Sequence, residues 1–436
     1  MRLGERSGGE SVEMSKMKAI IDARKLGDGG IGVYLENLVS GLLSLKGTGA
    51  PIDLTLLLEP RRIVGLRSEE GTDWIYDRLR HWRGAVEFVE EPAGKYSLGE
   101  YFGLATRQRS VLDNADIYHS PHYTLPFRLN VPSVITVHDV IHLTNPETVY
   151  HRPIARALIR SAIERASHVI TVSHASLARL IKALGYSPTP MSVVPNALRD
   201  GMGPLPASDV QPILARFGIG QPYGLFVGDD REHKNLPGLL EAWTLVVSRL
   251  RAKIVEEPKL VIVSSRIRPE TRALIADLGL TDSVVILESV SPLELCALFN
   301  GSHIVVVPSF EEGFGLVALE GMACGVPVIC SPNSSLKEVC EGCAWYAESP
   351  SASALAETIL FVLLNPDDCV EKVREGLSRV RSFSTESVAQ MTYAVYQDVL
   401  FGGKGAHHPP RLDVAAAGFP AGDVSGNSAE HLRRTV

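Results

Sequence analysis

The chain has no long apolar segment and no excess of basic residues, and each absence argues against a class of protein. Its apolar runs, such as "TILFVLL" and "HIVVV", have the length of a strand or a short helix, whereas a bilayer-spanning helix needs about 20 apolar residues. The net charge of −7 argues against a general nucleic-acid binder, which would need a basic field to attract phosphates. We therefore expect a protein that is soluble or peripheral to a membrane and that binds no nucleic acid.

Cysteine is also scarce, with six residues that all lie in the last third of the chain. This number suits a reducing cytoplasm, where we expect the protein to reside. Cys340 and Cys343 form a C-x-x-C pair, which is a candidate redox or metal site, but structural zinc needs a second ligand pair, and none occurs at a useful spacing. We interpret the pair as two small, partly buried thiols beside a turn.

Both ends of the chain lack the pattern of folded segments. Residues 1–17 have no apolar centre of the kind that a signal peptide needs, and we interpret them as a disordered extension. Residues 401–436 have the composition of a disordered tail. The rest of the 436-residue chain is long enough for two domains of ordinary size, each with its own core.

Between these ends, short apolar runs alternate with amphipathic helical patterns. The runs "KAIID" and "SVITVHD" are typical of buried strands, and "VYLENLVSGLLSL" is typical of a helix that covers a sheet. Such alternation favours parallel sheets covered on both faces, so the predicted fold class is α/β and doubly wound. The series occurs before and after a stretch rich in Pro and Gly near residue 200, which predicts Rossmann-like domains over 18–200 and 201–382 that face each other across a cleft.

Residues 27–32, "GDGGIG", match the G-x-G-x-x-G pattern of dinucleotide-binding loops. This match makes an NAD(P)-dependent oxidoreductase a candidate function. The pattern also needs a carboxylate about 20 residues further on, and Glu59 lies beyond that distance. The buried strand should also run straight into the first glycine, but the apolar run ends at Asp22 and the polar residues "ARK" follow. The oxidoreductase is therefore kept as the alternative function.

The segment "VVVPSFEEGFGLVALEGMACGVPVICS", residues 305–331, carries the most informative chemical pattern. A buried strand ends at Pro308, a loop with two glycines follows, and a helix is predicted over 316–323. The backbone N–H groups at the start of that helix suit a phosphate or the polar edge of a sugar. Glu312 and Glu320 are eight residues apart and face the same side, and two carboxylates suit a hydroxyl-rich ligand, because each accepts hydrogen bonds from a vicinal diol.

The pattern E-G-F-G-L-x-x-x-E followed by "GMACGVPVICS" resembles the E-x7-E signature of retaining glycosyltransferases of family 4. The resemblance implies the GT-B architecture, in which two Rossmann-like domains face each other, and it covers nearly the whole chain except both ends. It implies that Glu312 lies at the donor sugar and that Glu320 holds the ribose of the nucleotide. It further implies backbone contacts to the donor from Gly313, Phe314, Gly315 and Leu316.

Two other segments also carry the resemblance. The segment "YGLFVGDDREHKN" places Arg231 and Lys234 in a loop, and in the family an Arg and a Lys of this element clamp the diphosphate, where fixed cations stabilise the developing charge without a metal. The segment "SVITVHDVIHL" places His138 and Asp139 at the end of a buried strand. It resembles the family's H-D pair, whose histidine approaches the donor sugar near the reacting carbon.

The acceptor side of the resemblance lies in the glycine loop. The stretch "GGIGVY" resembles the family's GIG-x-Y loop, which implies that Gly30 and Gly32 let the backbone approach the acceptor, with Asp139 on the same side. The family often has Arg where Val33 stands, so a charged acceptor contact is missing from this chain. The glycine loop is therefore predicted to be a wall of the acceptor site, in place of a cofactor loop.

The expected site of the nucleotide base departs from the family pattern. The resemblance places the base near Val290, but Ser264 and Ser265 stand where a glycine is usual, and Glu288 and Ser289 stand in a second glycine region. The sequence therefore predicts no particular base.

Several remaining features have structural interpretations. Ser173, Ser176 and Asn196 are interpreted as helix caps and turn formers. A helix over 383–400 is expected to cross back onto the first domain, as the last helix of the family does. The helix "HRPIARALIRSAIERASH" has a basic face that suits an anionic membrane surface, although we favour a solvated face of a helix that covers the sheet; the face consists of Arg152, Arg156, Arg160 and Arg165.

These patterns, together with the resemblance, predict an enzyme that moves a hexose, with mannose favoured, from a nucleoside diphosphate sugar to a hydroxyl of a saccharide or lipid-linked acceptor. The resemblance implies retention at the anomeric carbon and a role in polysaccharide or glycoconjugate synthesis. The nucleotide sugar is a co-substrate, no other cofactor is predicted, and no metal is expected because the chain has no D-x-D triplet. A non-catalytic sugar-nucleotide binder and a phosphorolytic or hydrolytic enzyme are the further alternatives. The oligomeric state is not predicted.

Overall fold

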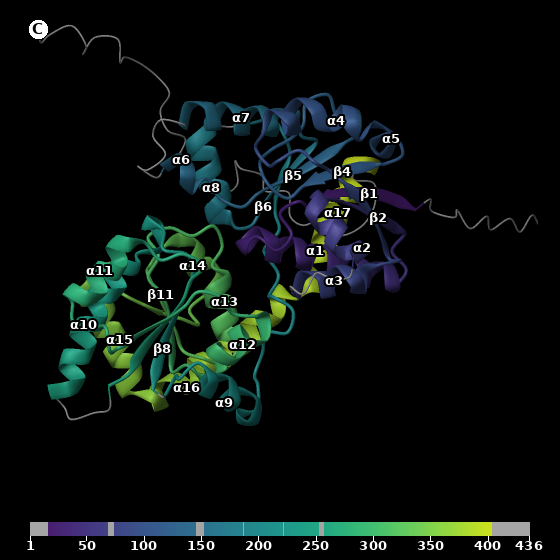
Figure 1. Ribbon diagram of the computed structural model, residues 1–436. Coiled ribbons are helices and arrows are strands. Elements are labelled where there is room, and N and C mark those ends of the chain that lie inside the picture. The colour runs from purple at the N-terminus through teal and green to yellow at the C-terminus, as the bar shows by residue number, and fades with distance from the viewer. Residues whose placement is uncertain are drawn as a thin grey trace, which may run out of the picture.

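The computed structural model of the protein describes residues 16–68, 74–144, 152–185, 187–220, 222–252 and 257–402. Two domains, each built on a parallel sheet, lie side by side (Figure 1). Most of the extension predicted over 1–17 and of the tail predicted over 401–436 lies outside the described residues. Two boundary residues correct those predictions, because Met17 is already the first residue of a strand and Phe401 is still the last residue of a helix.

The first sheet has the strand order β3-β2-β1-β4-β5-β6-β7, and all of its neighbouring strands are parallel. The chain changes direction across the sheet between β1 and β4, and open α/β sheets bind ligands at the carboxyl ends of the strands at such a point. The strands are β1 Met17–Asp22, β2 Ile52–Leu58, β3 Val86–Glu90, β4 Ile117–Ser120, β5 Ser133–Val137, β6 His168–Thr171 and β7 Met191–Val193.

Helices cover both faces of this sheet, as its central strands require. Strands β4, β5 and β6 are buried at every residue, so they need apolar neighbours on both sides. The helices of this part are α1 Gly29–Gly47, α2 Pro60–Ser68, α3 Trp74–Trp82, α4 Leu104–Arg107, α5 Arg109–Leu112, α6 Ile141–Thr144, α7 Arg152–Arg165 and α8 His174–Leu184.

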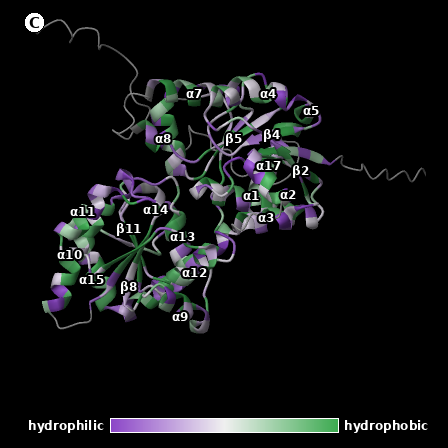
Figure 2. Ribbon diagram, viewed as in Figure 1, coloured by the Kyte–Doolittle hydropathy of each residue, from purple (hydrophilic) through white to green (hydrophobic). Residues whose placement is uncertain are grey.

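The second sheet repeats the arrangement with the order β10-β9-β8-β11-β12-β13, again with parallel neighbours, and its direction changes between β8 and β11. Figure 2 shows apolar residues along the central strands of this domain and hydrophilic residues spread over the surrounding helices. The strands are β8 Tyr223–Val227, β9 Lys259–Val263, β10 Val284–Leu287, β11 Ile304–Val307, β12 Val328–Cys330 and β13 Trp345–Tyr346. The helices are α9 Ala207–Arg216, α10 Leu236–Ala252, α11 Pro269–Asp277, α12 Pro292–Gly301, α13 Leu316–Ala323, α14 Ser334–Cys340, α15 Ala352–Leu364 and α16 Val370–Arg379.

Local sequence signals set the starts of the helices that lead to the site. Helix α12 begins with a capping box, in which Ser291 and Glu294 satisfy each other's backbone N–H groups, and Pro292 occupies the first helical position. Ser173 is the N-cap of helix α8, and its hydroxyl accepts a hydrogen bond from the N–H of Ser176 at 3.0 Å. The structure thus shows the capping role predicted for Ser173.

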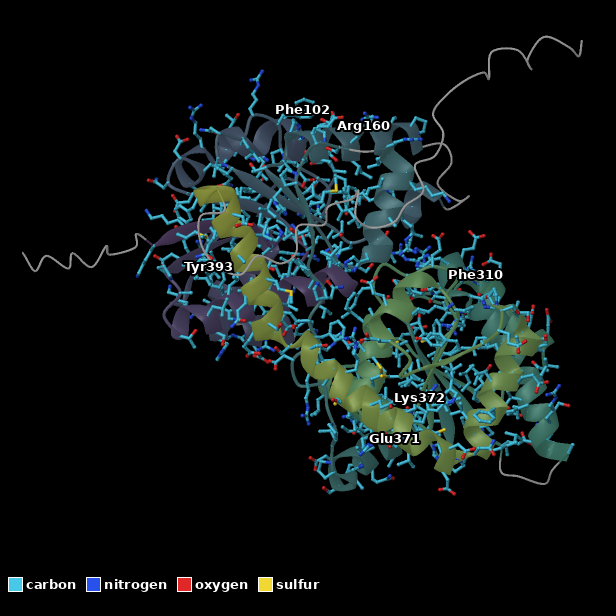
Figure 3. All side chains as sticks on the ribbon, turned by 180° about the vertical axis from the view of Figure 1, so that it is seen from behind. Phe102, Arg160, Phe310, Glu371, Lys372 and Tyr393 are labelled. Carbon is cyan, nitrogen blue, oxygen red and sulfur yellow. The ribbon has the colours of Figure 1, made fainter. Side chains whose placement is uncertain are left out.

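The last helix, α17 Thr385–Phe401, leaves the second domain and packs along α1 of the first domain, as Figure 3 shows from behind. The close approach requires glycine at position 41, because a Cβ there would lie 2.6 Å from the Cβ of Ala389. The hydroxyl of Tyr396 also lies 2.6 Å from Nδ1 of His119, which is fully buried in β4. The C-terminal helix is therefore part of the core of the first domain.

Cys340 and Cys343 lie at the end of α14 and in the turn that follows it, and both are buried and free. This placement agrees with the interpretation of the C-x-x-C pair as thiols beside a turn. None of the helices in the described part of the chain combines the length and apolarity that a bilayer crossing requires.

Candidate active site at the junction of the two domains

Glu312 lies in the loop between β11 and α13 and is almost completely buried, with 8% of the residue exposed. Its Oε1 atom accepts hydrogen bonds from Nζ of Lys234 and from Oγ of Ser309, each at 2.7 Å. Burial alone would raise the pKa of the Glu312 carboxyl, but the ammonium of Lys234 and the hydroxyl of Ser309 outweigh burial and lower the pKa. Glu312 is therefore an ionised acceptor at neutral pH.

Lys234 comes from the loop after β8, at the end of the 3-10 turn Glu232–Lys234. Asn235 follows it in a left-handed conformation, with φ of 54°, and donates from Nδ2 to the carbonyl of Pro308 at 3.2 Å. The N–H of Phe310 donates to the carbonyl of His233 at 2.8 Å. These contacts join the loop after β8 to the loop after β11 and hold Lys234 against Glu312.

Arg231 lies at the exposed edge of the same loop. Its side chain is 68% exposed, and its Nε atom is 3.9 Å from Oδ2 of Asp229. Asp229 also accepts a hydrogen bond from Oγ of Ser265 at 2.7 Å. Ser265 is one of the residues that replace the usual glycine. The structure thus joins Lys234 to Glu312 and places Arg231 at the surface beside them.

The start of α13 depends on glycine. Gly315 has φ of +114°, and a Cβ at this position would lie 2.6 Å from Cδ2 of Leu336, so both conformation and space exclude a larger residue. Phe314 packs edge-on against Phe383, with ring centroids 5.7 Å apart. Because the Phe314 ring is buried in this contact, the loop offers its backbone, and the N–H groups at Leu316 and beyond form the helix N-terminus.

Glu320 is buried in α13 and has a separate partner. Its Oε1 atom accepts a hydrogen bond from Nε of Arg199 at 2.9 Å. Arg199 lies in the segment between the two sheets, and sequence reasoning missed it because no local pattern links it to a residue 121 positions away. Any ligand hydroxyl that binds Glu320 shares the carboxylate with Arg199.

His138 follows β5 in the first domain. Its Nε2 atom donates to the carbonyl of Pro121 at 2.9 Å, and its ring meets that of Tyr34 edge-on, with centroids 4.7 Å apart. Burial lowers the pKa of His138, and the hydrogen bond to Pro121 and the charge of Asp139 only partly oppose this effect. The imidazole is therefore neutral at pH 7, with the proton on Nε2 and a lone pair on Nδ1.

Gly313 brings the two halves of the predicted site together. A Cβ at this position would lie 2.8 Å from the carbonyl oxygen of His138 and 3.2 Å from Cβ of Asp139. The hydroxyls of Ser173 and Ser176 each donate to the carbonyl of Gly313 at 2.8 Å. The loop that carries Glu312 in the second domain therefore lies directly on the H-D pair of the first domain.

Helix α8 makes further contacts across the junction. Arg179 donates to the carbonyl of Glu312, one helical turn beyond Ser176. From α14 of the second domain, Oε1 of Glu338 accepts the N–H of His174 at 2.9 Å and Oε2 accepts the N–H of Ala175 at 3.1 Å. A carboxylate of one domain thus satisfies the N-terminus of a helix of the other. Sequence reasoning missed Arg179 and Glu338, because the partner of each lies more than 130 positions away.

The glycine loop is part of a helix rather than a cofactor loop. Helix α1 begins at Gly29, so the start predicted at Val33 is late by one turn. A Cβ on Gly32 would lie 2.8 Å from the N atom of Gly27, so glycine at this position permits the tight entry to the helix. Gly30 is exposed and has open space around its Cα.

Val290 and two further histidines of the first domain occupy different places. Val290 is partly buried at the entry to α12, and Glu288 beside it forms an ion pair with Arg272. His142 is partly buried with its ring stacked on Tyr123, at a centroid distance of 5.0 Å. His119 is a structural residue, because its two ring nitrogens lie 2.6 Å from Tyr396 Oη and 2.8 Å from Thr136 Oγ1.

Three potential metal ligands come together among the described residues, namely Asp22, Glu100 and His122, and all three are buried. The ammonium of Lys95 lies 2.8 Å from Oδ2 of Asp22, and the guanidinium of Arg24 contacts both carboxylates, at 2.6 and 2.9 Å. Two side-chain cations therefore already balance the two carboxylates.

The basic helix is only partly free to meet a partner. Arg156 and Arg160 are exposed on α7, and Arg160 pairs with Glu164 at 2.9 Å. Arg165 donates to the carbonyl of Pro126 and its guanidinium lies 4.2 Å from the centre of the Phe127 ring. The side chain of Arg152 lies outside the described residues.

The family model described as glycosyl transferases group 1 matches residues 215–378, and the model described as Glycosyltransferase Family 4 matches residues 28–199. The O-antigen chain mannosyltransferase B of Escherichia coli is 30% identical over 292 residues, which cover 64% of this chain and 74% of that protein. The O-antigen chain mannosyltransferase RfbU of Salmonella typhimurium is 27% identical, over 61% of this chain and 70% of that protein.

Among solved structures, Anabaena Alr3699/HepE in complex with UDP-glucose superimposes with a TM-score of 0.68 at 17% identity, over 88% of this chain and all of that one. Sucrose-phosphate synthase from Thermosynechococcus elongatus gives a TM-score of 0.66 at 19% identity, over 88% of this chain and 99% of that one. At these identities the likeness concerns the fold, which is the two-domain GT-B architecture.

Proposed function

The chain belongs to the glycosyl transferases group 1 family, and from this premise we propose that it transfers a hexose from a nucleoside diphosphate sugar to a saccharide or lipid-linked acceptor with retention of configuration. It is a glycosyltransferase, and mannose is the donor sugar that we propose first, because relatives over most of the chain are mannosyltransferases of O-antigen chains. The observation that carries the proposal is the position of Gly313, which joins the Lys234–Glu312 pair to His138 and Asp139.

The proposed donor site lies in the second domain. Lys234 and the N-terminus of α13 stabilise the charge that develops on the departing diphosphate, and such fixed electrostatics are usually the largest catalytic contribution. Arg231 is exposed and has to swing inward to contribute, so its contribution is the smaller one. Because side-chain cations supply the positive charge, we propose that transfer needs no divalent metal. Activity that disappears with EDTA and returns with added Mg²⁺ or Mn²⁺ would contradict this point.

The first domain presents the acceptor. The hydroxyl oxygen of the acceptor forms a bond to the anomeric carbon on the face from which the diphosphate departs, and the departing phosphate oxygen takes the hydroxyl proton. His138, neutral and fixed by Pro121, lies beside this reaction, in which the departing phosphate oxygen and not the imidazole takes the proton. Glu312 has its Oε1 occupied by Lys234 and Ser309, so it acts as an acceptor for sugar hydroxyls rather than as a covalent nucleophile.

The test is a screen of nucleotide sugars for release of nucleoside diphosphate, first alone and then with mannose-containing acceptors. We expect a nucleoside diphosphate mannose to be turned over and an acceptor to raise the rate. The anomeric configuration of the product, measured by NMR before it equilibrates, should be that of the donor. An inverted product contradicts the mechanism, and a screen without turnover contradicts the function. A nicotinamide absorbance change with an alcohol substrate would support the oxidoreductase in its place.

Contact with a membrane forms a separate part of the proposal. Arg156 and Arg160 are exposed on one side of α7, and Arg160 lies on the same face of the first domain as Phe102, which is 65% exposed (Figure 3). Apolar and basic side chains together suit an anionic bilayer surface, where a lipid-linked acceptor would lie. Co-sedimentation with anionic vesicles, and its loss in the variant Arg156→Glu/Arg160→Glu, tests this point. Binding that is equal for neutral and anionic vesicles would contradict it.

A further inference from the structure

Tyr96 combines an exposed aromatic ring with an unusual backbone. Its φ is 62°, in the left-handed region that bulky residues rarely occupy, and 45% of the residue is exposed. A strained residue persists only where its surroundings force the conformation, and such residues gather at binding and catalytic sites. A buried ring would explain the strain by packing, but a ring that is nearly half exposed needs another reason.

A buried group of charges holds Tyr96 in this conformation. The N–H of Tyr96 donates to Oε2 of Glu100 at 2.5 Å, while Oε1 of Glu100 accepts from Arg24 at 2.9 Å. The preceding residue, Lys95, pairs with Asp22 at 2.8 Å. The carboxylates and the guanidinium are at most 1% exposed and Lys95 is 7% exposed, so the backbone on both sides of Tyr96 is fixed by contacts that solvent cannot weaken.

The ring of Tyr96 begins a row of rings that leads to the junction of the domains. Its centroid lies 5.9 Å from that of Tyr123, and Tyr123 stacks on His142 at 5.0 Å. His142 follows Asp139 by three residues, and Asp139 lies against Gly313 of the donor-side loop. The row therefore runs from an exposed ring to the place where the acceptor hydroxyl must meet the donor.

The row also borders the glycine loop. Lys25 lies between β1 and the start of α1, and its Nζ atom is 5.5 Å from the centre of the Tyr96 ring. Its side chain is 25% exposed, so the ammonium can donate hydrogen bonds to a ligand above the ring. An aromatic ring with an ammonium group over it is a surface of mixed character, which offers both an apolar and a polar contact.

We propose that Tyr96 is the platform for a sugar ring of the acceptor glycan, and that Tyr123 and His142 continue this surface toward the donor-side loop. The chemistry fits a pyranose, which has a face of C–H groups that packs on an aromatic ring and a rim of hydroxyls that bind polar groups. The proposal rests on the proposed function. It adds a role for Tyr96, which is separated from His142 by the ring of Tyr123. Tyr96 binds the penultimate sugar of the acceptor, and the terminal sugar accepts the hexose.

The acceptor class follows from this placement. A single sugar at the reaction site cannot reach Tyr96, so the enzyme should use an acceptor of two or more sugar units better than a single sugar. Loss of the Tyr96 ring should remove this preference and leave the turnover of the donor unchanged, because Tyr96 does not contact Lys234 or Glu312 among the described residues.

The experiment compares the methyl glycoside of one sugar with the methyl disaccharide that ends in the same sugar. For the full-length enzyme we expect a lower KM for the disaccharide. In Tyr96→Ala the KM for the disaccharide should rise about tenfold, with kcat and hydrolysis of the donor by water unchanged. Tyr96→Phe should keep the preference because the ring remains. Phe361→Ala, which removes a ring that is 47% exposed on α15 of the second domain, is the matched control and should change nothing.

Saturation-transfer NMR with the disaccharide and no donor gives a readout that does not depend on turnover. We expect transfer to the penultimate sugar in the wild type and in Tyr96→Phe, and its loss in Tyr96→Ala at an unchanged melting temperature. Equal KM ratios and equal NMR transfer in wild type and Tyr96→Ala would overturn the platform. An enzyme that turns over no nucleotide sugar would overturn the proposed function, while the NMR experiment would still decide the platform.

Discussion

The two domains contain different kinds of ion pair. In the second domain, the side chains of Lys234 and Glu312 are 20% and 10% exposed, so the pair keeps contact with its surroundings. In the first domain, the side chains of Asp22, Arg24 and Glu100 are at most 1% exposed. A pair at the end of a loop can share its charge with a ligand, whereas a sealed group cannot change partners without a large desolvation cost. Charge on the proposed donor side is thus available for chemistry, and charge on the proposed acceptor side fixes shape.

The largest effect should follow from removing the available charge. In Lys234→Ala, transfer should fall about 10³-fold in kcat, because the cation that we propose to stabilise the departing diphosphate is gone. The same variant leaves Glu312 buried without its partner, so thermal stability should fall as well. Steady-state release of nucleoside diphosphate and a melting curve measure the two effects.

The double variant Lys234→Ala/Glu312→Gln separates the effect on transfer from the effect on thermal stability. It removes the unpaired charge and should restore most of the stability, but not the transfer. Arg249→Ala, which breaks an exposed pair with Glu357 in the same domain, is the control and should leave both quantities unchanged. Recovery of transfer in the double variant would show that Lys234 only stabilises the fold.

A second variant changes the contact between the two sides without changing any charge. In Gly313→Ala the new Cβ would lie 2.8 Å from the carbonyl of His138, so the domains must separate slightly. A small displacement of the reacting groups lowers kcat, and we expect a fall of about 10- to 100-fold. The melting temperature should change little. Gly47→Ala, at the far end of α1 with open space around it, is the matched control. Normal kcat in Gly313→Ala would mean that the junction is open during the reaction.

The comparison also explains how much the sequence predicts. The alternation of strands and helices predicts both sheets, and the donor-side residues are predictable because Lys234 and Glu312 each lie in a short continuous pattern after a buried strand. The sealed group of the first domain is not predictable in this way. Its contact between Arg24 and Glu100 joins residues 76 positions apart, and only the folded chain brings them together. The left-handed backbone of Tyr96 has no sequence signal either, since glycine or asparagine would be the usual residue there.

Acid should lower the stability of the first domain. Burial, with a smaller contribution from His138, lowers the pKa of His119 to about 3. The unfolded chain binds a proton at this histidine below about pH 6.5, whereas the folded protein does not do so until about pH 3. His119 alone therefore lowers the free energy of unfolding by about 1.4 kcal/mol per pH unit as the pH falls through this window.

Urea denaturation at several pH values tests this expectation. His119→Asn should be less stable at pH 7, because two hydrogen bonds are lost, but its stability should depend less steeply on pH. His81→Asn replaces an exposed histidine of α3 and serves as the control. Equal slopes for the wild type and His119→Asn would show that the buried histidine does not limit stability in acid.

The smallest effect concerns the strain at Tyr96 itself. Tyr96→Gly and Tyr96→Ala both lose the ring, so any difference between them reports the backbone alone. Glycine adopts a φ of 62° without strain, and the glycine variant should therefore be the more stable of the two by about 1 kcal/mol. Both variants should lose the disaccharide preference equally, because the ring and not the backbone contacts the sugar. If glycine were no more stable than alanine, the sealed charges would not be holding Tyr96 against a strain, and the shape-fixing role of these charges would lose one of its supports.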